Sequence, residues 1–306
     1  MTASSRILVV GDLIDDVIVR PHGPIAVDTD TPSTIERRGG GSAANTACWL
    51  AAAGARVVFV GTVHHDDVDH HSAVLADAGV EAVLTGSNLP TGAIVVISDG
   101  SVRTMLTSRG ANTETGPGSV DQALLAQVGR LHLTGHPFMS DDRDDAWRSL
   151  LDSAEAAGVA RSVDPGSAAL LATYGPRRFR RLVAGVELLL PNQDEAALLT
   201  GESDPERAAR ALAADHALVV VTLGPAGALA CAGDTVVTAS AVPTEPVDVT
   251  GAGDAFAAGL LGALAGGLDL PEAMAAASTL ASRAVAIVGA RPVLAAGRAG
   301  ASAPLC

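Results

Sequence analysis

The chain has 306 residues, of which 48% are hydrophobic, enough for one large or two small domains with a sizeable core. Its formal charge of −14 argues against binding to nucleic acid, because a phosphate backbone would meet little positive charge. All 20 basic residues are arginine, so a bound phosphate would have to be met by arginine, backbone amides or a metal ion.

The cysteines and the N-terminal residues indicate a reducing compartment. Cys48, Cys231 and Cys306 are far apart and odd in number, so they form neither a disulfide framework nor a Cys-x-x-Cys metal site. The first residues lead into an apolar run without the features of a secretory signal. No apolar run reaches the ~18 to 20 residues that span a bilayer. We therefore expect a cytoplasmic protein.

Short apolar runs alternate with alanine-rich stretches along most of the chain. The runs that we expect to form strands are 7–10, 57–60, 131–133, 188–190 and 218–222. The stretches that we expect to form helices are 45–53, 71–78, 145–157 and 205–214. This alternation predicts an α/β fold with a parallel sheet covered on both faces, and ligands at the carboxyl ends of its strands.

Two stretches, 16–37 and 91–108, instead alternate polar and apolar residues, and SDGS at 98–101 is typical of a hairpin turn. We interpret them as antiparallel strands of a small β lid. The predicted division is an α/β body at 1–15, 39–90 and 109–295, a lid at 16–38 and 91–108, and a flexible tail at 296–306. Because such a lid has open edges, we expect it to pair with a second copy in a homodimer.

Two motifs near the N-terminus could bind a polyol. In GGGSAANTA, which begins at Gly39, the glycines let backbone approach a ligand, and Ser42 or Asn45 could donate to its hydroxyls. An ordinary glycine-rich loop before a helix has the same pattern. In GDLIDD, Asp12 and Asp16 would project from the end of the first strand, where carboxylates could bind hydroxyls. Ordinary turn chemistry also explains these two residues.

Two later motifs could serve a nucleotide and its metal. In PNQDEA, Asn192 and Glu195 lie three apart at a helix start, so they could hold Mg²⁺ through its waters or form a capping box. In VVVTLGPAGALA, the backbone from Thr222 to Gly224 could support a nucleotide. Many strand-to-turn transitions look the same.

The most specific motif is DVTGAGD, which ends at Asp254. If Gly251 to Gly253 form the first turn of a helix, their N–H groups and the helix dipole create an anion hole. Asp254 would then be placed to take a proton from an attacking hydroxyl. Phosphoryl transfer from ATP needs this combination of groups. The chain has no GxxxxGK[ST] motif, which excludes a P-loop enzyme.

DVTGAGDAF together with GGSAANTA, PNQDEA and VTLGPAGALA, in their chain order, resembles the ribokinase-like (PfkB) family of carbohydrate and nucleoside kinases over residues 7–292. The resemblance implies a three-layer α/β/α sandwich with a mostly parallel central sheet and a small β lid. It also implies ATP-dependent phosphorylation of a hydroxymethyl group on a ribose- or ketose-like sugar or a sugar acid. The alternatives are a nucleoside kinase with an adenosine- or pseudouridine-like acceptor, and a non-catalytic member that binds a metabolite.

The resemblance also implies roles for individual residues. Asp254 would be the catalytic base, beside an anion hole formed by Gly251, Ala252 and Gly253. Acceptor-binding positions would be Asp12, Asp16, Gly40, Gly41 and Asn45, with Val96 and Met105 of the lid. Nucleotide-binding positions would be Asn192, Thr222, Gly224 and Gly227, with Glu195 and Asn192 binding Mg²⁺ through water. A monovalent cation, usually potassium in ribokinase, would lie near Asp248, Thr250, Ala284, Ile287 and Gly289.

Departures from the family pattern concern the acceptor and the potassium site. Ribokinases have lysine where this chain has Ser42, and the lack of lysine disfavours a sugar-phosphate acceptor unless Arg103 or Arg109 substitutes. Val293 stands where a potassium site would offer a serine hydroxyl. Arg109 could reach an acidic substrate such as a ketodeoxy sugar acid, or face solvent. His136 follows a strand on the sugar side and is a candidate specificity residue.

Residues 64–71 read HHDDVDHH, a composition typical of metal sites. In the family this place is a surface loop before a helix. We interpret the aspartates as charges at a helix N-terminus and the histidines as incidental.

Overall fold

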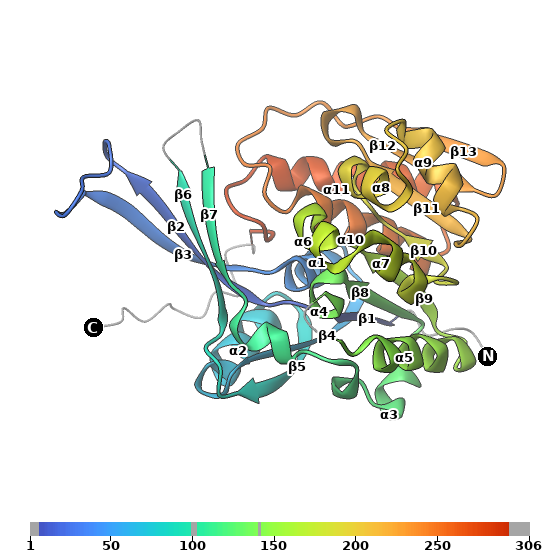
Figure 1. Ribbon diagram of the computed structural model, residues 1–306, viewed down its shortest axis with the longest axis horizontal. Coiled ribbons are helices and arrows are strands. Elements are labelled where there is room, and N and C mark those ends of the chain that lie inside the picture. Colours follow the sequence, from blue (N-terminus) through green and yellow to red (C-terminus); the bar gives the residue numbers. More distant parts are fainter. Residues whose placement is uncertain (1–5, 99–102, 140–141, 294–306) are drawn as a thin grey trace.

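The structure is a computed structural model that describes residues 6–98, 103–139 and 142–293. Its centre is a nine-stranded sheet in the order β13-β12-β11-β10-β9-β8-β1-β4-β5 (Figure 1). The strands are β1 (Arg6–Val10), β4 (Arg56–His64), β5 (Val80–Ser87), β8 (Arg130–Thr134), β9 (Ala160–Asp164), β10 (Leu188–Leu189), β11 (Leu218–Thr222), β12 (Ala228–Ala232) and β13 (Thr235–Ala239). The pairings from β5 through to β11 are parallel, and β12 pairs antiparallel with both β11 and β13.

The strands are apolar on both faces because helices cover the sheet on both sides. In β1, Leu8 and Val10 belong to one buried cluster, and Ile7 and Val9 belong to the other. The first face is covered by α3 (Gln122–Leu125), α4 (Gly135–Phe138), α5 (Asp144–Ala156), α6 (Ala168–Tyr174), α7 (Pro176–Val183), α8 (Gln193–Thr200) and α9 (Pro205–Leu212). The second face is covered by α1 (Ser42–Ala52), α2 (Val68–Asp77), α10 (Ala252–Ala265) and α11 (Leu270–Val285). The three-layer α/β/α sandwich predicted from the sequence is therefore confirmed.

A second, four-stranded sheet projects from the body on the left of Figure 1. It contains β2 (Ile14–Pro21), β3 (Ser33–Gly40), β6 (Gly92–Ser98) and β7 (Arg103–Ser108) in the order β3-β2-β6-β7. The pairs β2–β3 and β6–β7 are antiparallel, as expected, whereas the central pair β2–β6 is parallel. The hairpin turn expected at 98–101 falls largely outside the described residues, and the expected tail at 296–306 falls wholly outside them.

The parallel sheet brings polar residues from distant parts of the sequence to one edge. Asp12 follows β1, His136 follows β8, Asp164 ends β9, Asn192 follows β10, and Thr222 ends β11. Because carboxyl ends of parallel strands meet at the same edge of a sheet, these residues surround one site. An isolated parallel bridge between Asn192 and Thr222 extends the pairing to this edge.

Short 3₁₀ helices complete the chain, namely η1 (His65–Asp67), η2 (Gly110–Glu114), η3 (Pro117–Ser119) and η4 (Gly224–Ala226). Within the described ranges, no helix combines the length and the apolar character needed to cross a membrane.

Candidate active site

Asp254 lies in the first turn of α10, at the carboxyl edge of the main sheet. The helix begins directly after Gly251, whose φ of 79° is a left-handed conformation that favours glycine. A Cβ at Gly251 would also lie 2.6 Å from the carbonyl oxygen of Ala290. Only glycine therefore fits this helix start, which fixes where Asp254 points.

The same turn presents backbone donors. The N–H of Ala252 is bonded to Val249, and that of Ala255 to Gly251. Among the described residues, the N–H groups of Gly253 and Asp254 have no acceptor. Free donors at the positive end of a 14-residue helix form a site for an anion. The anion hole expected from the motif is thus geometrically available beside the Asp254 carboxylate.

Two side chains of α1 hold the Asp254 carboxylate. The Ser42 hydroxyl donates to Oδ1 at 2.7 Å, and the Asn45 amide donates to Oδ2 at 2.9 Å. Burial raises the pKa of Asp254 to about 6, while the hydrogen bonds from Asn45 and Ser42 act in the opposite direction. A carboxylate with a pKa near neutrality is suited to accept a proton from a hydroxyl.

The start of α1 is fixed on Asp12. Its carboxylate accepts hydrogen bonds from the N–H groups of Ser42 at 3.0 Å and Ala43 at 3.2 Å. Gly41 precedes the helix with a φ of 91°, and a Cβ there would lie 2.5 Å from the carbonyl oxygen of Asp12. Asp12 is 5% exposed and also accepts a hydrogen bond from Thr134. In this structure Asp12 therefore positions the helix that carries Ser42.

Arg291 completes the environment of Asn45. Its Nε donates to Asn45 Oδ1 at 3.1 Å, and its Nη2 donates to the carbonyl oxygen of Gly40 at 2.7 Å. Because Oδ1 of Asn45 accepts from Arg291, the amide nitrogen of Asn45 is turned toward Asp254. Burial raises the pKa of Asp16 to about 6, against the lowering effect of the Arg291 charge. Asp16, Gly40, Asn45 and Arg291 thus form one connected group beside the candidate base.

The remaining acceptor-side candidates divide into two groups. His136 Nδ1 lies 3.8 Å from Asp12 Oδ1, and the Arg109 guanidinium donates to the carbonyl oxygen of His136. Val96 and Met105 instead face each other in the β6–β7 register, where Met105 is 57% exposed. Among the described residues, no hydrogen bond or ion pair links Val96 or Met105 to Asp12. The structure therefore brings His136 and Arg109 to the site and leaves Val96 and Met105 on the lid.

A small cavity of about 120 Å³ lies next to Asp254. It is lined by Ser42, Asp164, Gly166, Leu190, Asn192, Glu195, Thr222, Gly253, Asp254, Phe256 and Ala257. Asn192 and Glu195 form a reciprocal capping box at the start of α8, with both hydrogen bonds at 2.9 Å. The capping interpretation of this pair is confirmed, and it places Glu195 in the cavity wall.

The acidic groups around this cavity fit a hard cation. Glu195 is 2% exposed, and burial raises its pKa to about 7. Burial raises the pKa of Asp164 well above its ordinary value, and the neighbouring Glu195 and Asp254 add to this effect. Mg²⁺ prefers carboxylate and water oxygens, and a divalent ion would offset the repulsion among these carboxylates.

A groove of about 670 Å³ adjoins this cavity, sharing Thr222, Gly253 and Phe256 with it. Its other lining residues are Gly224, Pro225, Gly227, Ala241, Val242, Pro243, Thr244, Pro246, Val249, Ala252, Ser278, Ala281, Ser282 and Val285. This lining is mostly apolar, and an apolar groove of this kind suits a flat aromatic ring such as a nucleobase. Three residues that the sequence indicated for nucleotide binding line this groove, namely Thr222, Gly224 and Gly227.

The positions considered for a monovalent cation also come together. Asp248 accepts hydrogen bonds from the N–H groups of Thr250 and Gly289 at 3.0 Å. The N–H of Ile287 donates to the carbonyl oxygen of Ala284 at the end of α11. The N–H of Asp248 also donates to the carbonyl oxygen of Val285 at 3.2 Å, so the two segments that carry these five residues lie side by side. Potassium binding there remains a prediction.

Comparison with known proteins assigns the family. The model of the pfkB family of carbohydrate kinases matches residues 4–295. The chain belongs to the PfkB family. This kinase is 30% identical over 263 residues to an ATP-dependent ribose-1-phosphate kinase of Halopiger xanaduensis, with 84% of this chain and 83% of that protein covered. It is 32% identical to the bifunctional protein HldE of Shewanella baltica, of which it spans 59%.

Among solved structures, the kinase resembles the adenosine kinase of Sinorhizobium meliloti, with a TM-score of 0.84 and 26% sequence identity. That match covers 95% of this chain and 97% of the other. The chain is therefore a sugar or nucleoside kinase of the PfkB family, which implies ATP as phosphoryl donor and generally Mg²⁺.

Two residues of this site were not found from the sequence. Asp164 belongs to VDPG directly after a buried strand, a signal of the same kind as GDLIDD. Arg291 has no local motif, and it meets Asn45 across 246 positions of the chain.

Proposed function

We propose that this kinase transfers the γ-phosphoryl group of ATP to a hydroxymethyl group of a small sugar or nucleoside, with Asp254 as the base. The observation that carries this proposal is the position of Asp254. Its carboxylate, held by Ser42 and Asn45, lies directly beside the free N–H groups at the start of α10.

In the proposed reaction Asp254 accepts the proton of the acceptor hydroxyl. The acceptor oxygen forms its bond to the γ-phosphorus while the bond between that phosphorus and the bridging oxygen of ADP breaks. The N–H groups of Gly253 and Asp254 stabilise the charge on the oxygens of the moving phosphoryl group. The proton on Asp254 is then released to solvent, and the products are ADP and the phosphorylated acceptor.

Glu195 and Asp164, with Asn192, are the residues that would hold Mg²⁺ through its waters. When bound, the ion neutralises charge on the ATP phosphates. Asn192 and Glu195 also fix the start of α8 through their capping box, so the wall facing the phosphates keeps its shape. The nucleoside part of ATP would lie in the apolar groove, because that groove meets the anion hole at Gly253.

The acceptor would lie among Asp16, Gly40, Asn45 and Arg291. Carboxylate and amide groups at this place suit the adjacent hydroxyls of a sugar ring. The likeness to an adenosine kinase supports a nucleoside as the alternative acceptor. Arg291 adds a positive charge to this group. Because this charge could bind an anionic group, acidic and phosphorylated sugars are also acceptors to test.

A panel of acceptors tests the proposal. ADP release would be measured with ribose, fructose, a ketodeoxy sugar acid, ribose 1-phosphate, adenosine and pseudouridine, each with ATP and Mg²⁺. We expect one class to raise ADP release far above the acceptor-free rate. Binding of an acceptor without turnover, under conditions where ATP also binds, would contradict the proposal and favour the non-catalytic alternative.

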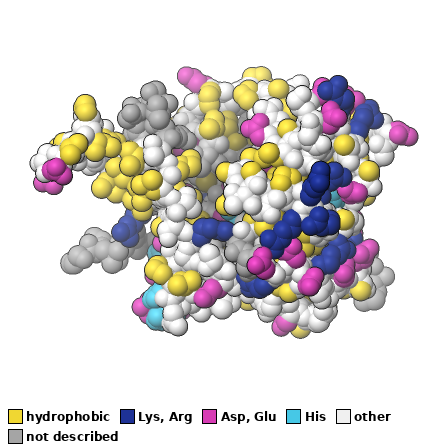
Figure 2. Space-filling model, viewed as in Figure 1, with side chains coloured by type: hydrophobic (Ala, Val, Ile, Leu, Met, Phe, Trp, Pro, Cys, Tyr) yellow, Lys and Arg dark blue, Asp and Glu magenta, His cyan; other side chains and the backbone are white. Residues whose placement is uncertain are grey.

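We also propose that two copies of the kinase pair through their lids. The lid carries several large apolar side chains that are 56% to 84% exposed, namely Ile25, Val27, Ile35, Met105 and Leu106. Hydrophobic side chains gather on the projecting lid in Figure 2. Its outer strands β3 and β7 also leave unpaired edges in the described structure. An exposed apolar sheet with open edges is a surface suited to a second copy.

A further inference from the structure

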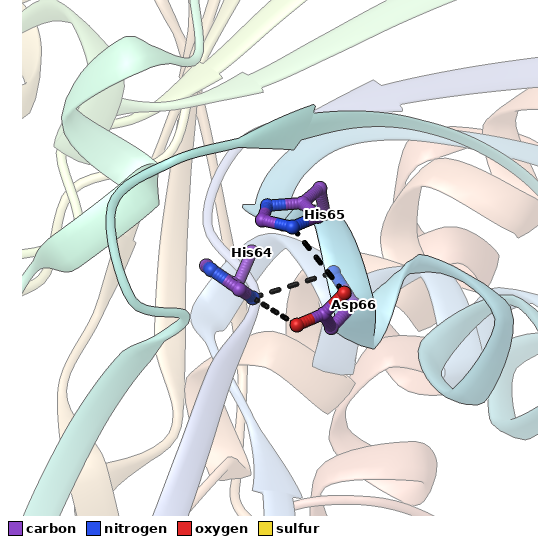
Figure 3. A group of neighbouring side chains, drawn as sticks. All are labelled: His64, His65 and Asp66. Carbon is purple, nitrogen blue, oxygen red and sulfur yellow. Dashed lines mark hydrogen bonds and ion pairs between the residues drawn. The ribbon is translucent and has the colours of Figure 1, made fainter.

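A group of metal-ligating side chains lies outside the candidate active site, where β4 ends and η1 begins (Figure 3). The group consists of His64, His65 and Asp66, and one donor atom from each lies within 4.8 Å of the others. His65 Nε2 is 3.3 Å from Asp66 Oδ1, and His64 Nδ1 is 3.8 Å from Asp66 Oδ2. In a tetrahedral zinc site with bonds of ~2.0 to 2.1 Å, donor atoms lie about 3.3 Å apart. Small side-chain rotations would therefore suffice for coordination.

The hydrogen bond to Ser87 prepares His65 for this role. His65 Nδ1 lies 3.2 Å from the carbonyl oxygen of Ser87, which can only accept a hydrogen bond. Nδ1 therefore carries a proton, and in the neutral ring the lone pair of His65 is on Nε2, the atom that faces Asp66. In known metal sites a ligating histidine usually donates its other N–H to a carbonyl or carboxylate in this way.

His64 has the complementary arrangement. Its Nδ1 accepts a hydrogen bond from the backbone N–H of Asp66, so this nitrogen holds a lone pair on the side of Asp66. The bond is 3.3 Å long, beyond the usual range for N–H donors, so a metal ion could replace it at little cost. Both imidazoles thus place a ring nitrogen toward the side chain of Asp66, as Figure 3 shows.

The other members of HHDDVDHH have different surroundings. Asp67 accepts a hydrogen bond from Thr91 at 2.5 Å, and His71 is 4% exposed and lies 3.7 Å from Asp15. The side chains of His65 and Asp66, in contrast, are 56% and 77% exposed. His64, His65 and Asp66 therefore face a common point, whereas Asp67 and His71 contact other parts of the protein. Asp69 and His70 are exposed and lie outside the group.

We propose that His64, His65 and Asp66 bind one divalent transition-metal ion such as Zn²⁺, with water completing the coordination. Two imidazole nitrogens and one carboxylate form a donor set that suits Zn²⁺, whereas Mg²⁺ prefers oxygen donors alone. The site is therefore distinct in chemistry from the Mg²⁺ site of the kinase reaction. It differs from the expectation, drawn from the sequence, that these histidines are incidental.

Titration of the metal-free, full-length protein with Zn²⁺ against a chromogenic chelator tests this site. We expect one saturable equivalent that millimolar Mg²⁺ does not displace. His65→Gln and Asp66→Asn should each weaken this binding by at least about tenfold. His70→Gln is the matched control, because His70 is an exposed histidine of the same segment outside the group.

Circular dichroism of each variant checks that it remains folded, so a loss of binding reports on the ligand itself. Binding that is unchanged in both His65→Gln and Asp66→Asn, or weakened equally in His70→Gln, would overturn the assignment. Zinc bound elsewhere, for example at the carboxylates near Asp254, would remain in all four proteins and would not produce the expected difference.

Discussion

The amide nitrogen of Asn45 donates to Oδ2 of Asp254 at 2.9 Å, joining the start of α1 to the start of α10. Together with the Ser42 hydroxyl on Oδ1, this bond fixes the plane of the carboxylate. Each carboxylate oxygen can accept a second hydrogen bond, so an incoming hydroxyl still has a place to bind. The relationship makes the direction and the proton affinity of the candidate base depend on residues of α1.

Replacement of the proposed base, Asp254, is the first test of this arrangement. Asp254→Asn should lower kcat by about 10²- to 10⁴-fold, because the amide cannot accept the hydroxyl proton. The Kd for ATP should change little, since the backbone donors and the apolar groove remain. Steady-state kinetics and calorimetric titration with ATP would measure the two effects, with the exposed Asp77→Asn as a control. Near-normal kcat in Asp254→Asn would rule out this residue as the base.

The pH dependence of the reaction should report the environment of Asp254. Its raised pKa of about 6 means that kcat/KM should increase with pH through a midpoint near this value and then level off. The hydrogen bond from Ser42 stabilises the charged form and lowers the pKa. Ser42→Ala should therefore move the midpoint to higher pH. A profile that is flat between pH 5 and pH 8, or a shift to lower pH in the variant, would contradict this explanation.

The same raised pKa predicts a pH-dependent effect on stability. Between pH about 4 and 6 the folded protein keeps a proton on Asp254 that the unfolded chain has already lost. Folding then takes up a proton, so rising pH weakens the wild type through this group. Asp254→Asn has no such proton. As pH rises from 4 to 7, the unfolding free energy of the variant should therefore increase by up to about 3 kcal/mol relative to that of the wild type.

Urea unfolding of both proteins at several pH values would measure this difference. Burial lowers the pKa of His71, His132 and His216, but these histidines are common to both proteins, so their contributions cancel in the difference. A difference in unfolding free energy that stays constant with pH would show that Asp254 is not desolvated in the ligand-free state.

Arg291 should act on Asp254, the proposed base, through Asn45. Arg291→Met removes the donor that orients the amide, and we expect kcat to fall roughly 10- to 100-fold. It also removes a positive charge that lowers the pKa of Asp254, so the midpoint of the pH profile should rise. Arg291→Lys keeps the positive charge but loses the hydrogen bond from Nε to Asn45. The midpoint of its pH profile should therefore lie closer to the wild-type value than its kcat does. Arg207→Met, at an exposed ion pair with Glu202, is the control.

The lid should determine the oligomeric state. Ile35 lies on the edge strand β3 and is 63% exposed, so Ile35→Glu would place a charge on the proposed contact surface. We expect a dimer for the wild type and a monomer for Ile35→Glu in sedimentation velocity. Leu198→Glu changes a partly exposed leucine of α8 away from the lid and should leave the dimer intact. A monomeric wild-type protein would remove the basis of this prediction.

The parallel core could be predicted because its strands are apolar on both faces and short. The run at 7–10, for example, is wholly buried in β1. Strand β9 was not expected, since Arg161 and Ser162 interrupt its apolar pattern. Arg161 is only 2% exposed, and its charge is met by Glu155 and Glu187. Such a pairing depends on tertiary structure and leaves no local periodicity to detect.

The candidate site shows the same division. Asp254 could be proposed from the sequence because its neighbours in the chain are also the residues that form the candidate anion hole. Arg291 was missed because its contacts with Asn45 and Gly40 arise only when the segment after α11 returns to the end of β3. Local motifs therefore indicated the residues proposed for phosphoryl transfer, whereas the proposed acceptor side depends on contacts between distant segments.

Strand β3 of the lid ends at Gly40, and α1 begins two residues later at Ser42. The lid and the two residues that hold Asp254 therefore belong to one continuous segment. A change in the position of β3 would thus be felt first at Gly40 and Gly41, directly before the two side chains that bond Asp254. We therefore expect the position of the lid to influence how Ser42 and Asn45 hold Asp254, so that an acceptor which contacts the lid also affects the candidate base.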